Sequence, residues 1–300
     1  MAKQLKSIPV SVGDLVEYLD NHSDFAFEIK VLNSLIASGF TCEHGGTYDD
    51  PVTNKPREFD IRATRTFEKR FLRLAVECKN LRTNFPLHIS CLPRRDEEAF
   101  HEIAYSVNPE TNPIEEPPEP FCVAMLPQSK GIRMTGTQSL YHAGEPVGKS
   151  CEQVGRASND EITASDSDVF DKWSQALSSA HDLTYLACSD GNERTGDVAL
   201  SLVIPIVVVP DGRLWVTQFD KDGNRNTDPQ LADRCSYFVS RSYFHRSASG
   251  GDDLTLSHLE FLTISGVDAF IRSLCGTNEQ VEATFPAERI FQCLYEQIGV

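Results

Sequence analysis

The sequence predicts an α/β fold in which one mixed sheet is flanked by helices. Three observations lead to this prediction. Apolar residues recur at helical spacing from Phe25 to Ile36, the short segments around Asp60 and Glu77 have the composition of strands, and residues 200–209 form the most apolar run of the chain. That run is rich in β-branched residues, which favour a strand buried on both faces. The expected core is therefore helix, three strands, helix and strand, in that order along the chain.

The N-terminal elements of this core follow from spacing, capping and turn residues. Residues 12–20 carry apolar side chains at helical spacing and predict a short first helix. A second helix is expected over residues 24–38, with Asp24 as its N-cap and Gly39 as its stop. Turn residues then separate three predicted strands, at residues 41–48, 57–63 and 71–78.

The middle of the chain reads differently, because prolines interrupt it repeatedly. Residues 80–167 predict a long irregular insertion on the sheet, not a separate domain. Within the insertion, a short helix is expected at residues 97–105 and a strand at residues 121–126.

Regular structure is expected to return after the insertion. A helix is predicted at residues 168–186, followed by the apolar strand 200–209, in which Pro205 requires a sheet edge or a bulge. The turn residues 210–212 predict a hairpin with a strand at 214–217. Further strands are expected near residues 237–244 and 261–264, and further helices at 267–274 and 287–298. We expect one domain over residues 1–300, with its core at about 24–79 and 168–220 and a C-terminal extension at about 221–300.

Charge is distributed unevenly along the chain. The net charge of −16 argues against unselective binding of nucleic acid, because phosphates attract positive charge. Residues 54–95 are the exception: eleven Lys and Arg against four acids give a balance of +7, so the remainder carries −23. This pattern predicts an acidic body with one basic binding face. Solvated strand surfaces are the alternative explanation.

Composition also bears on location. No apolar stretch approaches the roughly 20 residues that a membrane span requires. The first residues lack the apolar centre of a signal peptide. The nine cysteines include no C-x-x-C pair, and several lie in apolar runs, as reduced and buried thiols do. We therefore expect a cytoplasmic protein with no membrane partner.

Asp60 and Glu77 are the candidate catalytic acids. Side chains alternate between the faces of a strand, so Glu77 and Lys79 would point the same way and Cys78 the other. If the strand that carries Asp60 pairs with this one, two carboxylates and an ammonium converge. Hard carboxylate oxygens select Mg²⁺ or Mn²⁺, which polarises a phosphodiester and activates water. We expect Asp60 and Glu77 to bind the metal together with the Cys78 carbonyl, and Lys79 to orient the water.

An E-x-K triplet is common by itself, so this prediction depends on the predicted helices and strands that surround the triplet. A second triplet, at residues 28–30, lies on a predicted helix, where residues i and i+2 do not share a face. The alternative is that Asp60 and Glu77 are strand-surface residues that form ion pairs with Arg62 or Lys79 across the ladder.

The order of elements around these acids resembles the PD-(D/E)XK phosphodiesterase superfamily, the restriction-endonuclease-like nucleases. The resemblance covers the core elements, but neither the insertion nor the C-terminal extension. It implies that Asp60 is the metal-binding aspartate, Glu77 the second acid, Lys79 the lysine and Glu28 an assisting acid. The Pro-Asp of the family name is Phe59-Asp60 here. The resemblance further implies a Mg²⁺-dependent or Mn²⁺-dependent endonuclease acting on DNA, in genome defence or restriction.

Two alternative functions stay open. Some members of the superfamily keep the fold without cutting, so the chain is alternatively a silent module that binds nucleic acid or a partner protein. Residues 143–150 match the loose form of a phosphate-binding loop, which would make the chain a nucleotide-binding protein. That loop requires a preceding strand and a following helix N-terminus, and the sequence favours neither.

The residues around this segment have another predicted role. Lys149, Gln153 and Arg156 are expected to form a polar loop near the nuclease cleft and to contact the phosphate backbone. The acidic body also suggests a subunit that works in an assembly, with a partner protein or with further copies of this chain.

Overall fold

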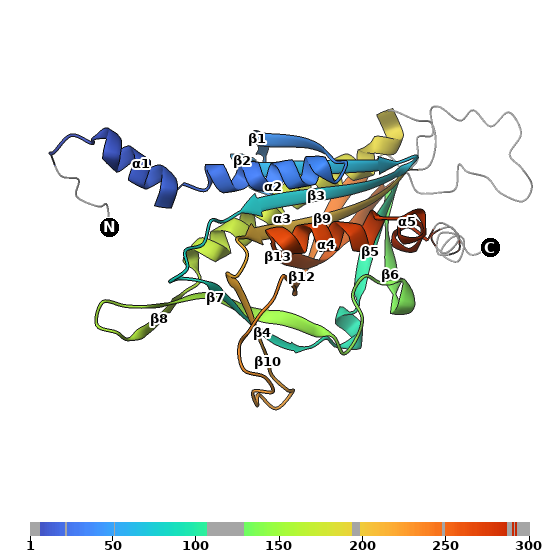
Figure 1. The fold of residues 1–300 in the computed structure, drawn as a ribbon. Helices are drawn as coiled ribbons and strands as arrows, with labels where there is room; N and C mark the ends of the chain where they lie inside the picture. The colour runs from blue at the N-terminus through green and yellow to red at the C-terminus, as the bar shows by residue number, and fades with distance from the viewer. Residues whose placement is uncertain are drawn as a thin grey trace, which may run out of the picture.

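One large mixed sheet runs through the molecule, with helices on both of its faces (Figure 1). A computed structural model describes residues 7–21, 23–50, 52–106, 129–193, 199–247 and 250–286, together with 290 and 292. Within these residues, thirteen strands belong to the sheet, and its main path runs β1-β2-β3-β9-β13-β12-β7-β4-β10-β11. The predicted α/β class with a mixed, helix-flanked sheet is confirmed.

The first part of the sheet has the predicted order of elements. Helices α1 (Val12–Asn21) and α2 (Phe25–Ala37) precede strands β1 (Thr41–Asp49), β2 (Pro56–Phe67) and β3 (Arg70–Cys78). Gly39 follows α2 with a φ of +84°, in the left-handed region that ends helices and favours glycine. Strands β1 and β2 pair antiparallel, and so do β2 and β3, because short turns connect them.

Helix α3 (Ser167–Glu193) and strand β9 (Ala199–Val209) complete the predicted core. Strand β9 is buried along its whole length and pairs parallel with β3. On its other side it pairs with β5 (Phe100–Ser106) at residues 199–201 and with β13 (Gly250–Thr263) at residues 206–209. Pro205 lies in the interval between these two partners, so its missing N–H is tolerated within a central strand.

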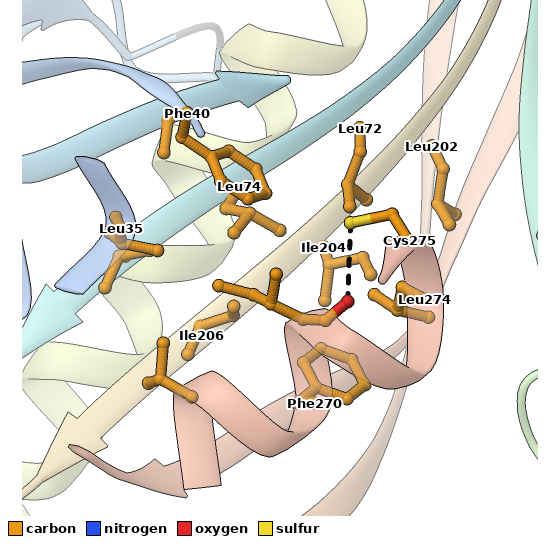
Figure 2. Close-up of a cluster of buried hydrophobic side chains, with 14 of the residues drawn as sticks. Leu35, Phe40, Leu72, Leu74, Leu202, Ile204, Ile206, Phe270, Leu274 and Cys275 are labelled. Carbon is orange, nitrogen blue, oxygen red and sulfur yellow. Dashed lines mark hydrogen bonds between the residues drawn. The ribbon is translucent and has the colours of Figure 1, made fainter. Parts of the chain in front are cut away.

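Two helical layers cover the sheet. On one face, α2 and α4 (Ile264–Cys275) pack against β2, β3 and β9 in one hydrophobic cluster. Figure 2 shows the centre of this cluster, where the Cys275 thiol donates a hydrogen bond to the Ile271 carbonyl at 3.3 Å. On the opposite face, α3 packs against small and apolar residues of β3 and β9. Residues on the two faces of β3 therefore meet different helices.

The predicted irregular insertion is wrong, because the described part of residues 80–167 is mainly strand. It contributes β4 (Leu87–Pro93), β5, β6 (Ser129–Thr135), β7 (Pro146–Arg156) and β8 (Ile162–Ser165), together with two short 3₁₀ turns, Asp96–Glu98 and Gly136–Gln138. The helix expected at 97–105 is one of these turns followed by β5, which gains ladder partners in β6 and β9. The strand predicted at residues 121–126 lies outside the described residues.

The C-terminal part also differs from one expectation. Strand β10 (Leu214–Gln218) follows the predicted turn, yet it pairs with β4 and β11 (Gln230–Leu231) and not with β9, so the predicted hairpin is wrong. The strand expected near 237–244 is confirmed as β12 (Arg234–Ser247), which forms a long hairpin with β13. Helix α4 confirms the prediction at 267–274, and α5 (Asn278–Thr284) was not predicted. The helix predicted at 287–298 lies almost entirely outside the described residues.

Helix α1 is the most exposed element of the fold. Figure 1 shows it projecting from the start of α2, away from the sheet. Its described side chains, including Leu15 and Leu19, are all exposed. Among the helices that the structure describes, no segment combines the length and the apolar character needed to cross a membrane.

Candidate functional site

Asp60 and Glu77 lie together at the end of the β2–β3 ladder. Each is one residue beyond the Ile61–Val76 pair of that antiparallel register. The Asp60 N–H donates to Glu77 Oε1 at 3.4 Å, and the Cys78 N–H donates to Asp60 Oδ2 at 2.7 Å. The two predicted acids are therefore neighbours on the face of the sheet that α3 covers.

A lysine that the sequence did not indicate lies between these acids. Lys172 Nζ donates to Asp60 Oδ2 at 2.7 Å and to Glu77 Oε2 at 3.1 Å. Lys172 belongs to the second turn of α3, next to the partly buried Trp173. The one feature of the sequence that could have indicated Lys172 is its position beside the apolar residues of the predicted helix 168–186. The sequence does not reveal which strands that helix crosses.

Polar contacts fix α3 at this position over the sheet. The Arg62 guanidinium of β2 donates to Asp182 Oδ2 at 2.7 Å, and the Ser178 hydroxyl donates to Asp50 Oδ2 at 2.6 Å. Burial opposes ionisation of Asp50, but hydrogen bonds from Ser178 and from local backbone N–H groups lower its pKa to about 2. Both contacts lie further along α3 than Lys172, so they hold the helix register that brings the ammonium to the acids.

The acids and the lysine strongly affect one another's protonation. Burial raises the pKa of Glu77 to about 8, and the nearby charge of Asp60 acts in the same direction against the opposing effect of Lys172. Burial also disfavours the Lys172 ammonium, but the two carboxylates outweigh it and raise the Lys172 pKa. A carboxyl group that is 1% exposed and holds its proton near neutral pH is typical of functional sites.

Lys79 does not occupy the position predicted for it. Its ammonium lies 3.6 Å from Asp24 Oδ2, at the N-terminus of α2, and Lys172 takes the place between the acids. Strand β3 ends at Cys78, so the alternation that would align Lys79 with Glu77 stops one residue too early. The Asn80 N–H also donates to Asp24, at 2.9 Å, which holds this chain segment against α2.

Glu28 and Cys78 contribute differently from the expectation. Glu28 Oε2 lies 3.2 Å from His44 Nε2, so Glu28 contacts a residue of β1. Cys78 is buried, and desolvation together with Asp60, Glu28 and Glu77 raises the pKa of its thiol well above the ordinary value. The contact of Cys78 with the site is its N–H, and the role of its carbonyl as a metal ligand stays a prediction.

A polar hollow of about 390 Å³ includes Lys79, two residues after Glu77, and Asp168, four residues before Lys172, in its lining. Lys79, Gln153 and Arg156 line it, so two of the three predicted phosphate-contacting residues share one surface with the predicted lysine. Gln153 is 4% exposed and donates to the Phe85 carbonyl at 3.1 Å, while its Oε1 atom has no hydrogen-bond partner. The hollow therefore presents cations together with a buried amide oxygen that lacks a donor.

Lys149 and the phosphate-binding loop are placed elsewhere. Residues 146–150 belong to β7, so this segment lacks the loop and the helix N-terminus that such a site requires. The Lys149 ammonium pairs with the buried Glu98 at 2.8 Å and lies 4.8 Å from the centre of the Phe238 ring. The expected polar loop is thus a strand, because β7 finds partners in β4 and β8.

The donor set fits a hard divalent cation in its chemistry. Two carboxylate oxygens converge on one positively charged atom, Lys172 Nζ, and such oxygens are the preferred ligands of Mg²⁺ and Mn²⁺. A metal at this point would have to displace the ammonium. Within the described residues, no cluster of three or more His, Cys, Asp and Glu side chains is suited to hold a metal ion.

Comparisons with protein-family models, with curated proteins and with solved structures found no match to this chain.

Proposed function

We propose that this chain is a metal-dependent nuclease that hydrolyses phosphodiester bonds, with DNA as its substrate. The observation that carries the proposal is the convergence of Asp60, Glu77 and Lys172 on one point. Phosphodiester hydrolysis can use two carboxylates to hold a metal ion and a lysine to stabilise negative charge. The helix, three-strand, helix, strand order of this part of the fold supports a restriction-endonuclease-like core.

Asp60 and Glu77 would hold Mg²⁺ or Mn²⁺. When bound, the metal supplies charge to the phosphate and a more acidic water. The chain itself supplies the remaining functions. Burial raises the pKa of Glu77 to about 8 even with Lys172 beside it, so a metal that binds Glu77 near neutral pH would displace a proton. Lys172 provides a fixed positive charge for a phosphate oxygen, and Lys79 with Arg156 binds the adjoining backbone in the hollow.

One observation favours a second candidate function. Lys172 already neutralises the two acids, so the chain provides its own counter-ion where a nuclease would bind a metal. A silent module that binds nucleic acid through the hollow would keep this arrangement permanently. The nucleotide-binding alternative has lost its support, because its loop is part of a strand. We also propose that the cleavage is endonucleolytic and serves genome defence or restriction. These two points rest on the resemblance to the PD-(D/E)XK superfamily alone.

The test is cleavage of supercoiled plasmid and of single-stranded DNA with Mg²⁺, Mn²⁺ or EDTA. We expect metal-dependent cutting that Asp60→Asn and Glu77→Gln each reduce by at least about 10²-fold, because each removes a carboxylate that would hold the metal ion. Lys221→Met, in an exposed turn, is the matched control and should cut like wild type.

The outcomes separate the two candidates. Cutting that survives both acid substitutions would contradict the assigned site. Binding of DNA without cutting under any metal would establish the silent module instead.

A further inference from the structure

Two cysteines far apart in the sequence meet in the interior. Cys91 of β4 and Cys235 of β12 have their Sγ atoms 3.6 Å apart, within hydrogen-bonding distance for sulfur, although 144 positions separate them. Both side chains are buried. Neither residue takes part in the candidate nuclease site, so the pair calls for a separate explanation.

The pair lies where two parts of the sheet are joined most sparsely. Strand β12 pairs with β7 through a single register pair, Tyr237 and Gly148, and Gly148 pairs with Cys91 on its other side. A Cβ atom on Gly148 would lie 2.7 Å from the Tyr237 ring, so only glycine permits this close approach. With no side chain between them at this point, the thiols of β4 and β12 come into contact.

The thiols are reachable by a small molecule. Cys91 and Cys235 both line a pocket of about 390 Å³, together with Arg234 and Ser236. The Cys235 thiol hydrogen-bonds to Cys91 and lowers the pKa of Cys91, and the Arg94 guanidinium acts in the same direction. The same hydrogen bond and burial raise the pKa of Cys235. Cys91 is accordingly the more nucleophilic thiol of the two at neutral pH.

We propose that Cys91 and Cys235 form a redox-active dithiol that a hydroperoxide oxidises to a disulfide, which links β4 to β12 across the intervening strand β7. The Cys91 thiolate attacks one peroxide oxygen, the O–O bond breaks, and Cys91 becomes a sulfenic acid with release of hydroxide, which takes up the proton lost by Cys91. Cys235 then attacks the Cys91 sulfur, the S–O bond breaks, and water leaves with the proton of Cys235. Two thiols and one hydrogen peroxide thus give one disulfide and two waters.

The sulfur separation must fall from 3.6 Å to the roughly 2.05 Å of a disulfide, so the two sulfur atoms must approach each other by about 1.5 Å. The product would close the sheet covalently at its single-pair junction. The proposal is independent of the nuclease assignment.

The test is peptide mapping by mass spectrometry after treatment of the full chain with hydrogen peroxide, without reduction. We expect a cross-linked Cys91–Cys235 peptide that dithiothreitol removes, and a reversible rise in Tm of roughly 5 °C from the large closed loop. Cys151→Ser removes another buried thiol, on the neighbouring strand β7, and should cross-link like wild type. Cys91→Ser should leave Cys235 unlinked.

Two results would overturn the proposal. One is peroxide-treated wild type in which both cysteines stay reduced, or in which Cys91 proceeds to a sulfinic acid without a cross-link. The other is a disulfide that joins either cysteine to a different partner. Mapping of wild type alone decides both, so the outcome does not depend on whether a variant folds.

Discussion

At the residue scale, the central feature is a buried ammonium shared by two acids. Lys172 contacts both Asp60 and Glu77, and all three side chains are at most 17% exposed. Removing one member of a buried cluster of charges leaves the other charges without a partner. The resulting loss of folding stability is larger than the stability that a surface ion pair provides. The cluster therefore links the stability of the fold to the occupancy of the candidate metal site.

Lys172→Met should make this link measurable. Without the ammonium, the Asp60 carboxylate loses its ion-pair partner, so we expect Tm in EDTA to fall by roughly 5–10 °C. Saturating Mg²⁺ should restore most of the loss, because a ligand that binds only the folded state stabilises it. Lys221→Met should show neither effect in differential scanning fluorimetry. A variant that Mg²⁺ leaves unchanged would show that the acids do not form a metal site.

Glu77 should also control how stability depends on pH. Its folded pKa of about 8 exceeds the ordinary value of 4.5, so the folded state retains a proton that the unfolded chain releases. The contribution of this proton to the free energy of unfolding is fully present below pH 4.5 and is lost as the pH rises through 8. Relative to wild type, Glu77→Gln should gain at least about 2 kcal/mol of unfolding free energy across this range. Urea titrations at several pH values measure this free energy of unfolding, with the exposed Glu161→Gln as control. Free energies of Glu77→Gln and wild type that change in parallel with pH would disprove the raised pKa.

At the element scale, β7 and the segment before β4 form the hollow together. Gly155 of β7 lies against Phe85 and Asn84, and a Cβ atom there would be 2.5 Å from the Phe85 ring. Gln153, two residues earlier on the same face of β7, bonds the Phe85 carbonyl. The close approach of these two segments thus sets the shape of the surface that Lys79 and Arg156 line.

Gly155→Ala should disturb this surface without touching the acids. The added methyl group would force the Phe85 ring to shift, so we expect the affinity for a short DNA oligonucleotide to fall about tenfold, or roughly 1.4 kcal/mol. Fluorescence anisotropy in EDTA measures binding apart from catalysis. Gly144→Ala is a poor control because its φ is positive, whereas Gly13→Ala, in exposed α1, is a suitable one. Unchanged affinity would place the nucleic acid elsewhere.

At the scale of the whole molecule, charge decides where a polyanion can bind. The chain carries −16 overall, yet Lys79, Arg82 and Arg156 outnumber the two acids, Asp24 and Asp168, in the lining of the hollow. Phosphates are therefore attracted to this surface and repelled from most of the remainder. Such a protein should make few phosphate contacts, and binding should depend on salt less steeply than that of a basic DNA-binding protein.

The salt dependence of DNA affinity tests this distribution. With two or three neutralised phosphates, the slope of log Kobs against log salt for duplex DNA should be about −2 to −3. Arg156→Ala and Lys79→Ala should each reduce its magnitude by about 1. Lys149→Ala, whose ammonium is paired with Glu98, should leave the slope unchanged. A steeper slope that Lys149→Ala reduces would move the interface to the β4–β7 surface.

The sequence by itself determined the elements whose partners are close along the chain. Helix α2, the β1–β2–β3 meander and the meeting of Asp60 with Glu77 all depend on apolar spacing, the Gly39 stop and short turns, which are local properties. The predicted N-cap is wrong, because the Asp24 side chain makes no capping hydrogen bond to α2 and accepts from the Asn80 N–H. Only the tertiary structure decided what lies across that meander. Lys172 reaches the acids from 95 positions away, and Lys79 turns to Asp24 because β3 ends at Cys78. Strands β4 to β8 were missed because proline-interrupted segments became strands only when ladders with distant segments satisfied their backbone groups. Pairing over long separations is set by the packing of the whole sheet, which no local pattern encodes.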